Sequence, residues 1–394
     1  MVMPILKLAL ALSGLGAALA SQWPVFDEPF KPARALNAMS APRTRTSRIL
    51  FIRTMTGERV GPCRVTNSTK GPEFFEHSWN SNANVIYLDQ PIYSGFSYAE
   101  YGETIYTTEE AAEDVAKAVV LFFESFSQYK GRSFHMAGIS YGGRYIPLFA
   151  SAVHDQNALL LAQGLIPVNL TSITIGNGNT DMSALWQGAY ELVCTSTTVT
   201  PVLPIRECIH MKHEVQQCRQ QMKEHCEDRF DLKPCRDAFN RCDTAIMDPY
   251  RKTGLNIYDI SRPCEGGSEN LCYPVTAEIT AYLSRPDVRA LLGVDAQVPE
   301  EYALCNMSVG NMVWAFMLPA TLYDLALSLE WSGKKAFNDA PLREWWAVGE
   351  KAGVTRSANG LTFATIDRAG HLAAHDKPEQ VLAMLNRWLA AVNL

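Results

Sequence analysis

The sequence predicts an α/β fold with a mostly parallel central sheet, helices on both faces and a disulfide-rich helical cap insertion. Two observations support this fold class: short apolar runs alternate with segments of helical periodicity, and one long cysteine-rich segment interrupts the alternation. Such alternation is typical of parallel strands joined by crossover helices. The 394 residues suffice for one large domain with an insertion.

The first expected elements precede the insertion. Residues 85–88 form a short apolar run that suits a buried parallel strand. Thr107 and Glu110 match a capping box and precede apolar residues at helical spacing. The elements that follow are a strand at 133–137, a helix from 143 to about 153, and a strand at 172–175.

Residues from about 181 to 292 are charged, rich in cysteine and mostly helical in pattern, so we interpret this segment as an inserted cap. The apolar run at 362–366 predicts another strand, and helical spacing from Val381 to Leu389 predicts a final amphipathic helix. We expect this helix to return the chain to the sheet.

The first twenty residues match a signal peptide. Lys7 precedes a short apolar stretch that ends in small residues at Ala18 and Ala20, and the stretch is too short to span a membrane. We therefore expect export into the secretory pathway, to an extracellular or a vacuolar/lysosomal destination, with no membrane span. The predicted organisation is a signal peptide at 1–20, a linker or propeptide-like segment at 21–48, and a domain at 49–394 with the cap at about 181–292.

Charge and cysteine usage fit an exported protein that binds no nucleic acid. The net charge of -6 lacks the basic excess that phosphate binding needs. Export makes the ten cysteines candidates for disulfides, and Asn67, Asn169 and Asn306 begin glycosylation sequons. A zinc site is the competing interpretation, because His210, His213 and His225 lie among the cysteines, although C-x-x-C pairs are missing.

A nucleophile motif lies between the expected strand at 133–137 and the helix after it. Residues 138–142 match G-x-S-x-G, with Ser140 at its centre. In this turn the glycines leave room for a sharp bend that lifts the serine hydroxyl above the sheet. The following helix directs backbone N–H groups toward a developing oxyanion, with Tyr141 as the expected donor. A plain glycine-rich turn is the alternative.

A serine nucleophile needs a base, and His371 is the best candidate. His371 follows the expected strand at 362–366 and precedes the last helix, which gives the chain order Ser, acid, His of α/β-hydrolases. His375 is the rival, further from the strand, and each could be a surface loop histidine. The sequence therefore predicts an α/β-hydrolase fold.

With these motifs, several ordered stretches resemble the serine carboxypeptidases of the carboxypeptidase Y type. The matching stretches are 78–98 (beginning SWNSNAN), 138–147 (GISYGGRYIP), 175–178 (IGNG), 253–259 (TGLNIYD), 264–267 (CEGG), 271–274 (LCYP) and 369–371 (AGH). The resemblance implies an acid-tolerant exopeptidase that takes peptide or protein C-termini as substrate. It would use Ser140 and His371 without a metal or another cofactor.

The resemblance also implies disulfides and a pocket. The implied pairs are Cys194 with Cys208, Cys218 with Cys242, Cys226 with Cys235, and Cys264 with Cys272. Tyr141, Trp186 and Phe316 would line an apolar pocket, or they could be core aromatics.

Three departures from the family pattern fall on the chemistry. Ile139 replaces a glutamic acid that helps to hold the substrate's terminal carboxylate. After the strand expected near 49–52, residues 53–60 replace the family's glycine-rich loop, which supplies an oxyanion donor. The family's cysteine partner for Cys305 would lie in that loop, which leaves Cys305 free or joined to Cys63. The catalytic aspartate and its strand are missing, with Asp324 as the nearest acid in a helix-like pattern.

Both gaps are abrupt and flanked by good matches, so we hypothesise that the chain comes from a misjoined or exon-skipped gene model. The predicted function is a serine-type carboxypeptidase by descent. One alternative is an inactive secreted glycoprotein that binds peptides or a partner. Another is a lipase, esterase or acyltransferase on the same scaffold.

Overall fold

The computed structural model describes residues 48–53, 60–98, 105–197, 199–229, 231–304 and 332–394. These residues form two compact units. One unit holds the described residues within Met1–Gly138, Leu148–Thr174 and Val275–Val313. The other holds those within Ile139–Pro147, Ile175–Pro274 and Trp314–Leu394.

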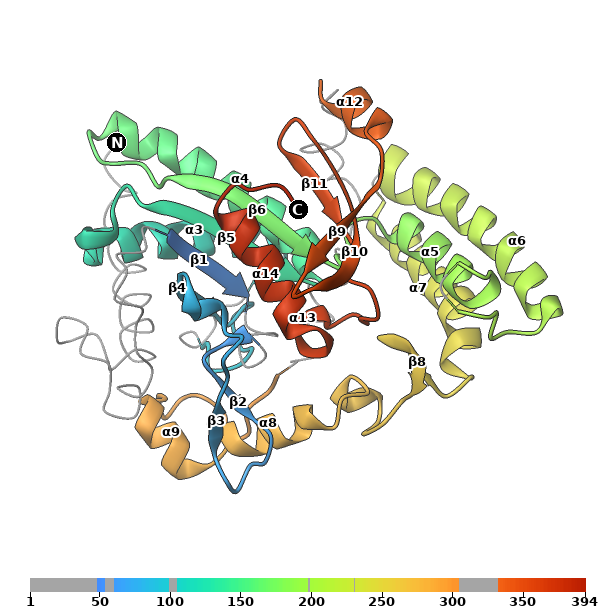
Figure 1. Ribbon diagram of the computed structural model, residues 1–394, viewed down its shortest axis with the longest axis horizontal. Coiled ribbons are helices and arrows are strands. Elements are labelled where there is room, and N and C mark those ends of the chain that lie inside the picture. The colour runs from blue at the N-terminus through green and yellow to red at the C-terminus, as the bar shows by residue number, and fades with distance from the viewer. Residues whose placement is uncertain (1–47, 54–59, 99–104, 198, 230, 305–331) are drawn as a thin grey trace. The chain divides into compact units, whose positions relative to one another are not determined.

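A four-stranded sheet forms the centre of the first unit (Figure 1). Its strands are β1 (Arg48–Arg53), β4 (Asn84–Leu88), β5 (Ser133–Ile139) and β6 (Leu170–Gly176), in the spatial order β4-β1-β5-β6. Strand β1 pairs in parallel with both β4 and β5. The bonds from Phe134 N to Asn169 O and from Ser140 N to Gly176 O show that β6 runs the same way as β5. The predicted parallel strands are therefore confirmed.

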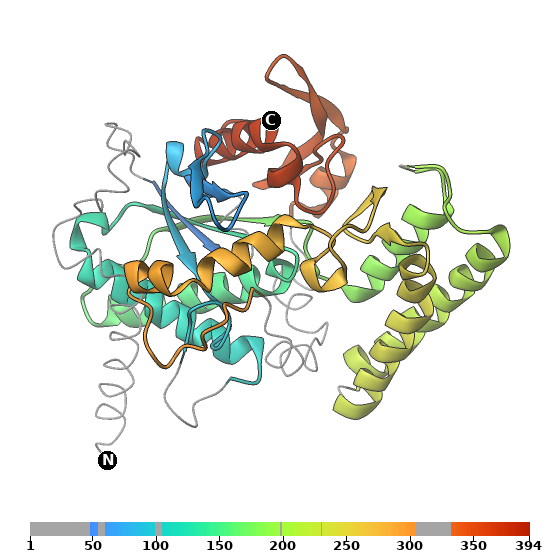
Figure 2. The ribbon, with the colours of Figure 1, turned by 90° about the horizontal axis from the view of Figure 1, so that it is seen from below.

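Both faces of β5 are covered. Phe134 and Met136 are fully buried. His135 and Ala137, which point to the opposite face because strand side chains alternate, are buried as well. Figure 2 shows α3 (Thr108–Ser125) and α4 (Gly142–Ala162) along one face of the sheet. Phe123 of α3 meets the edge of Phe134 at 5.6 Å between ring centroids.

The two long helices of this sheet differ in how well the sequence predicts them. The capping box at the start of α3 is present, because Thr107 and Glu110 each accept a hydrogen bond from the other's backbone N–H. Helix α4 is longer than the predicted 143–153 and continues through Pro147 to Ala162. It extends because apolar packing resumes after a polar stretch, with Leu160 buried.

Shorter elements complete the first unit. They are β2 (Cys63–Val65), β3 (Pro72–Phe74), α8 (Val275–Leu283) and α9 (Pro286–Leu292). Strands β2 and β3 form an antiparallel pair. Ser68, in the turn between them, donates its backbone N–H to Glu278 of α8 at 2.7 Å. Cys63 is a free thiol whose pKa burial raises, while Cys305 lies outside the described residues.

The cysteine-rich segment forms three packed helices and a hairpin. The elements are α5 (Met182–Cys194), α6 (Ile205–Met222), α7 (Leu232–Arg251), β7 (Leu255–Asn256) and β8 (Asp259–Pro263), with a π-helical turn at Lys223–Asp228. The disulfides are Cys194–Cys208, Cys218–Cys242, Cys226–Cys235 and Cys264–Cys272, the pairs that the family resemblance implies. Each such loop contributes about 2–4 kcal/mol of stability.

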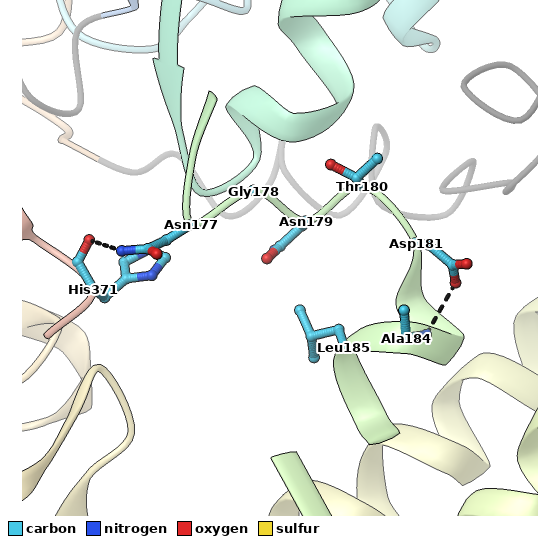
Figure 3. Close-up of a pocket in the computed structure, with 8 residues that line it drawn as sticks. All are labelled: Asn177, Gly178, Asn179, Thr180, Asp181, Ala184, Leu185 and His371. Carbon is cyan, nitrogen blue, oxygen red and sulfur yellow. Dashed lines mark hydrogen bonds between the residues drawn. The ribbon is translucent and has the colours of Figure 1, made fainter. Parts of the chain in front are cut away.

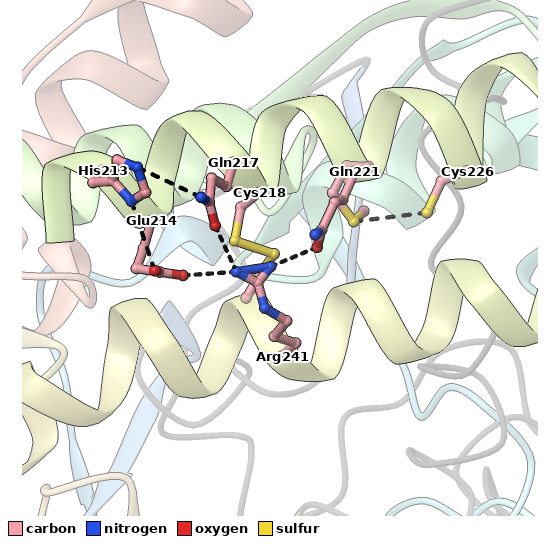
Figure 4. Close-up of a disulfide and its surroundings, with 9 residues drawn as sticks. His213, Glu214, Gln217, Cys218, Gln221, Cys226 and Arg241 are labelled. Carbon is pink, nitrogen blue, oxygen red and sulfur yellow. Dashed lines mark hydrogen bonds and ion pairs between the residues drawn. A yellow bond between two sulfur atoms is a disulfide. The ribbon is translucent and has the colours of Figure 1, made fainter. Parts of the chain in front are cut away.

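Arg241 reinforces the disulfide between α6 and α7 (Figure 4). From α7, its guanidinium donates to Glu214 and Gln217 at 2.9 Å each and to Gln221 at 2.7 Å. These acceptors lie on successive turns of α6, beside Cys218–Cys242. The planar, forked guanidinium suits such a multiple contact, so the two helices are joined both covalently and by hydrogen bonds.

The C-terminal segment corrects one prediction. Its elements are α12 (Lys334–Asp339), β9 (Arg343–Ala347), β10 (Glu350–Ala358), β11 (Leu361–Ala364), α13 (Ala373–Asp376) and α14 (Pro378–Leu389). The three strands form an antiparallel sheet of order β11-β10-β9. The strand predicted at 362–366 thus ends at Ala364 and runs antiparallel to β10. The cause is the Asn359-Gly360 turn, where both residues have positive φ and reverse the chain tightly.

The predicted final amphipathic helix is present as α14. Its Met384 packs on a core formed by Trp345, Ala347 and Ala352 of the antiparallel sheet.

Several predictions lie outside the described residues. They are the signal peptide at 1–20, most of the segment at 21–48, the junction at 54–59, and Cys305, Asn306, Phe316 and Asp324. Within the part of the chain that the structure describes, every helix is too short or too polar to cross a membrane.

Candidate active site

Ser140 lies in the turn between β5 and α4, in a conformation that non-glycine residues rarely adopt. Its φ is 61°, in the left-handed region. Three backbone hydrogen bonds hold it there. Ser140 N donates to Gly176 O at 3.0 Å, and Ser140 O accepts from Gly143 N at 2.9 Å and from Asn179 N at 2.8 Å. Backbone strain of this kind persists where the surrounding structure fixes it, often at functional sites.

Glycines allow the loop after β6 to touch the start of α4. A Cβ at Gly143 would lie 2.7 Å from the backbone nitrogen of Asn179. A Cβ at Gly178 would lie 2.8 Å from the Cα of Gly143. Neither contact leaves room for a side chain, so the close approach needs both glycines. Gly143, the last glycine of G-x-S-x-G-G, and Gly178, the last glycine of I-G-N-G, therefore act as a pair.

His371 is fixed by contacts on its main chain. Asn177 donates its side-chain Nδ2 to His371 O at 2.9 Å, and His371 N donates to Tyr258 O at 2.7 Å. The ring centroids of Tyr258 and His371 are 5.3 Å apart. Asn177 follows β6 directly, with a φ of 47°. The same short loop, 176–179, thus contacts Ser140 through its backbone and His371 through a side chain.

A pocket of about 420 Å³ opens beside this loop (Figure 3). It is lined by Asn177, Gly178, Asn179, Thr180, Asp181, Ala184, Leu185 and His371. Asp181 caps α5 by accepting from Ala184 N at 3.1 Å, which fixes the side of the pocket opposite His371. The lining combines polar groups with the apolar side chains of Ala184 and Leu185, a mixture that is common in small-ligand pockets.

The structure brings some predicted site residues together and separates others. His371 lines the pocket, while Ser140 is linked to its lining through Asn179. His375, the rival base, packs edge-on against Tyr273 at 5.5 Å. The side chain of Tyr141 is buried, and its backbone precedes the first residue of α4, where an oxyanion donor is expected.

Trp186 belongs to the core of the cap. It is 1% exposed and packs on Phe239 of α7 at 5.5 Å. This supports the core interpretation over the pocket one, while Phe316 lies outside the described residues.

Of the predicted sequons, Asn67 is partly exposed and Asn169 is exposed, as a glycosylation acceptor requires. Asn67 Oδ1 accepts from Thr69 N at 2.9 Å and from the Thr69 hydroxyl at 2.7 Å.

The zinc interpretation gains no support. Among the described residues, no three side chains of His, Cys, Asp or Glu are grouped to hold a metal ion. The eight cap cysteines are joined in disulfides, so their sulfurs are not thiolate ligands.

Asn177 is a residue of the candidate site that sequence reasoning missed, because it falls within the matched stretch 175–178 and no role is predicted for it. Its signal was an Asn-Gly pair directly after a strand, because asparagine tolerates positive φ and keeps an amide that can bond elsewhere.

Comparisons with known proteins extend the picture. The sequence model of the family described as serine carboxypeptidase matches residues 55–325 and 319–391. The carboxypeptidase Y of Candida albicans is 34% identical over 364 residues, which cover 84% of this chain and 64% of that protein. The carboxypeptidase Y of Komagataella phaffii is 34% identical over 362 residues, covering 84% of this chain and 66% of that protein.

A solved structure shares the fold. The crystal structure of Kex1(delta)p, a prohormone-processing carboxypeptidase from Saccharomyces cerevisiae, aligns with a TM-score of 0.71. It covers 92% of this chain and 86% of that one at 19% identity. The α/β-hydrolase fold predicted from the sequence is confirmed. The chain spans less than two thirds of the length of the curated relatives. The family match divides at 319–325, next to the second abrupt gap seen in the sequence.

Proposed function

The chain belongs to the serine carboxypeptidase family, and on this premise we propose that it is a serine-type carboxypeptidase that releases C-terminal residues from peptides. The carrying observation is the strained Ser140 turn, tied to the loop at 176–179 that also bonds His371. That arrangement supports a nucleophile and a base held by one short segment. Peptide or protein C-termini would be the substrates.

The proposed chemistry needs only groups of this chain and water. His371 removes the proton from the Ser140 hydroxyl, and the oxygen attacks the carbonyl carbon of the last peptide bond. The negative charge on the carbonyl oxygen is stabilised by backbone N–H groups at the start of α4, including that of Tyr141. His371 then gives its proton to the leaving amine, which departs as a free amino acid. Water, deprotonated by His371, hydrolyses the acyl-enzyme and restores Ser140.

Export is part of the same proposal. Four disulfides between cysteines form in oxidising compartments, which supports the secretory pathway. The destination would be extracellular or vacuolar/lysosomal, with glycans on Asn67, Asn169 and Asn306.

A specific observation favours a second candidate, a peptide-binding protein without turnover. The family match breaks at 319–325, where the family's catalytic aspartate is expected, and it begins only at residue 55. Loss of the orienting acid costs about 10⁴-fold in turnover. Loss of one oxyanion donor costs about 10²–10³-fold. Transcript reads that span 52–61 and 325–329 as printed would refute missing coding segments and favour this candidate.

Labelling with a fluorophosphonate probe tests the proposal. We expect the exported, glycosylated protein to be labelled, and Ser140→Ala to abolish labelling. Ser151→Ala, on the same helix, is the control and should label like the wild type. A labelled protein should also release free amino acids from a peptide acid but not from the same peptide amide. A folded protein that binds the peptide without labelling would contradict the proposal and support the second candidate.

A further inference from the structure

The loop that carries His371 is closed by its own carboxylate. Asp376, five residues after His371, accepts at Oδ2 from the backbone N–H of Gly370, the residue just before His371, at 2.9 Å. The Asp376 backbone N–H donates to Leu372 O at 3.1 Å, which sets the first turn of α13. The Asp376 side chain is 9% exposed, so this bond is shielded from water. This hydrogen bond thus closes the segment from Gly370 to Asp376 into a ring that contains His371.

An arginine from the cap binds the other oxygen of that carboxylate. Arg262 Nη2 donates to Asp376 Oδ1 at 2.8 Å, and Arg262 Nε donates to Asp259 Oδ2 at 2.5 Å. Asp259 Oδ1 accepts from the Ser261 hydroxyl at 2.6 Å and the Ser261 N–H at 3.1 Å. One guanidinium therefore bridges two carboxylates, 12% and 9% exposed, on segments far apart in the sequence. Charge-assisted bonds of this kind are stronger than neutral ones.

The hairpin that presents Arg262 is itself anchored in the cap. Asn256 is fully buried, and its side chain accepts from Tyr258 N at 2.8 Å and donates to Cys272 O at 3.3 Å. The Tyr250 hydroxyl of α7 donates to Asn256 O at 2.9 Å. Burial raises the pKa of Tyr250 to about 12, so this hydroxyl remains a donor. The hairpin is therefore a rigid support.

Gly370 shows how closely the two segments meet. A Cβ there would lie 2.7 Å from Tyr258 O and 2.8 Å from the Cβ of Asp259. Together with the bond from His371 N to Tyr258 O, this leaves the loop little freedom relative to the hairpin. Side chains of catalytic groups act well only when such surrounding contacts fix their orientation.

We propose that Arg262 and Asp376 are positioning residues for His371. They lock the loop at 370–376 to the cap hairpin, so that the imidazole keeps one orientation toward Ser140. Neither residue takes part in proton transfer. This inference rests on the proposed function, because it assigns His371 the role of base. It gives the hairpin at 255–263 a task besides its place in the cap, because the hairpin then supports the loop of the base, to which Asn177 also bonds.

Arg262→Met is the test, because methionine keeps the apolar stem and removes the guanidinium. Arg251→Met is a matched control. Arg251 also bridges two carboxylates, Asp243 and Asp248, at 2.9 Å each, and is 44% exposed against 42% for Arg262. Its partners lie on its own helix, α7, so removal should leave the base untouched.

We expect Arg262→Met to slow fluorophosphonate labelling of Ser140 and to lower kcat on peptides, each on the order of tenfold, with KM unchanged. Arg251→Met should match the wild type. Asp376→Asn, a second variant if Arg262→Met does not fold, should behave like Arg262→Met. Arg262→Lys, which keeps the charge, should recover part of the rate. Equal labelling rates in Arg262→Met and Arg251→Met would overturn the inference.

A second readout separates this inference from the proposed function. Amide hydrogen exchange at 369–376 needs no turnover. We expect faster exchange there in Arg262→Met than in Arg251→Met. If the wild type is not labelled at all, the proposed function fails, and exchange alone decides the inference. Unchanged exchange in Arg262→Met would then refute it.

Discussion

Backbone bonds alone hold the turn at Ser140, whereas the loop at His371 is held by side chains as well as by backbone. Around Ser140 the contacts are main-chain bonds to Gly176 and Asn179, made possible by glycines. Around His371, side-chain bonds that involve Asn177, Arg262 and Asp376 add to the backbone bond with Tyr258. A short sequence motif determines the backbone geometry at Ser140, but the side-chain contacts at His371 form only when the chain folds. The two halves of the site should therefore respond to different substitutions.

The largest effect should follow from placing a side chain at Gly143, where the start of α4 touches the loop at 176–179. Gly143→Ala places a Cβ 2.7 Å from Asn179 N, and backbone cannot easily move away. We expect a loss of about 1–3 kcal/mol in the free energy of unfolding, together with loss of labelling at Ser140.

Gly188→Ala is the control for that change. Gly188 lies inside α5 with open space around it, so alanine should gain up to about 1 kcal/mol. Urea unfolding of both variants gives the comparison. A stable Gly143→Ala variant that labels normally would contradict the claim that this backbone contact fixes the conformation of the Ser140 turn.

A smaller effect should come from Asn177, which serves both halves. Asn177→Gly keeps the positive φ but removes the amide that bonds His371 O, so we expect a loss of about 1 kcal/mol. Asn177→Ala also strains the backbone and should cost roughly 1 kcal/mol more. Thermal unfolding and labelling rates of both variants separate the lost hydrogen bond from the backbone strain. Equal stabilities of the glycine and alanine variants would contradict the strain.

The smallest effect should be the pH response of the side-chain support. Burial alone would raise the pKa of Asp259, but hydrogen bonds from Ser261 and Arg262 hold it below its ordinary 3.8. A carboxylate with a lowered pKa stabilises the fold above its ordinary pKa, and this stability is lost as pH falls through the lowered value.

Asp259→Asn should therefore be less stable than the wild type between about pH 5 and 7, and the difference should shrink below about pH 4. Urea unfolding across that range measures it. A difference that stays constant down to pH 2.5, roughly one unit below the ordinary pKa, would contradict the assignment of the pKa shift.

The sequence predicted what depends on local pattern. The strands at 85–88 and 133–137 and the capping box at Thr107 and Glu110 follow from apolar runs and caps, and the structure contains all of them. The match of Ser140 to a strand-turn-helix motif is local in the same sense.

What the sequence did not predict depends on long-range contacts or on turn chemistry. Strands β9 and β10 were missed because a register shift between Lys351 and Gly353 obscures their alternation. The direction of β11 depends on two residues with positive φ, Asn359 and Gly360. The support of His371 joins residues more than one hundred positions apart, which no spacing pattern reveals.

The most direct test is to identify which serine is labelled covalently and whether the labelling depends on His371. The glycosylated protein is reacted with a fluorophosphonate, digested, and mapped by mass spectrometry, alongside His371→Ala and His375→Ala. The account predicts an adduct on the peptide that holds Ser140, lost in His371→Ala and retained in His375→Ala. An adduct elsewhere, or one that His371→Ala leaves intact, would contradict it.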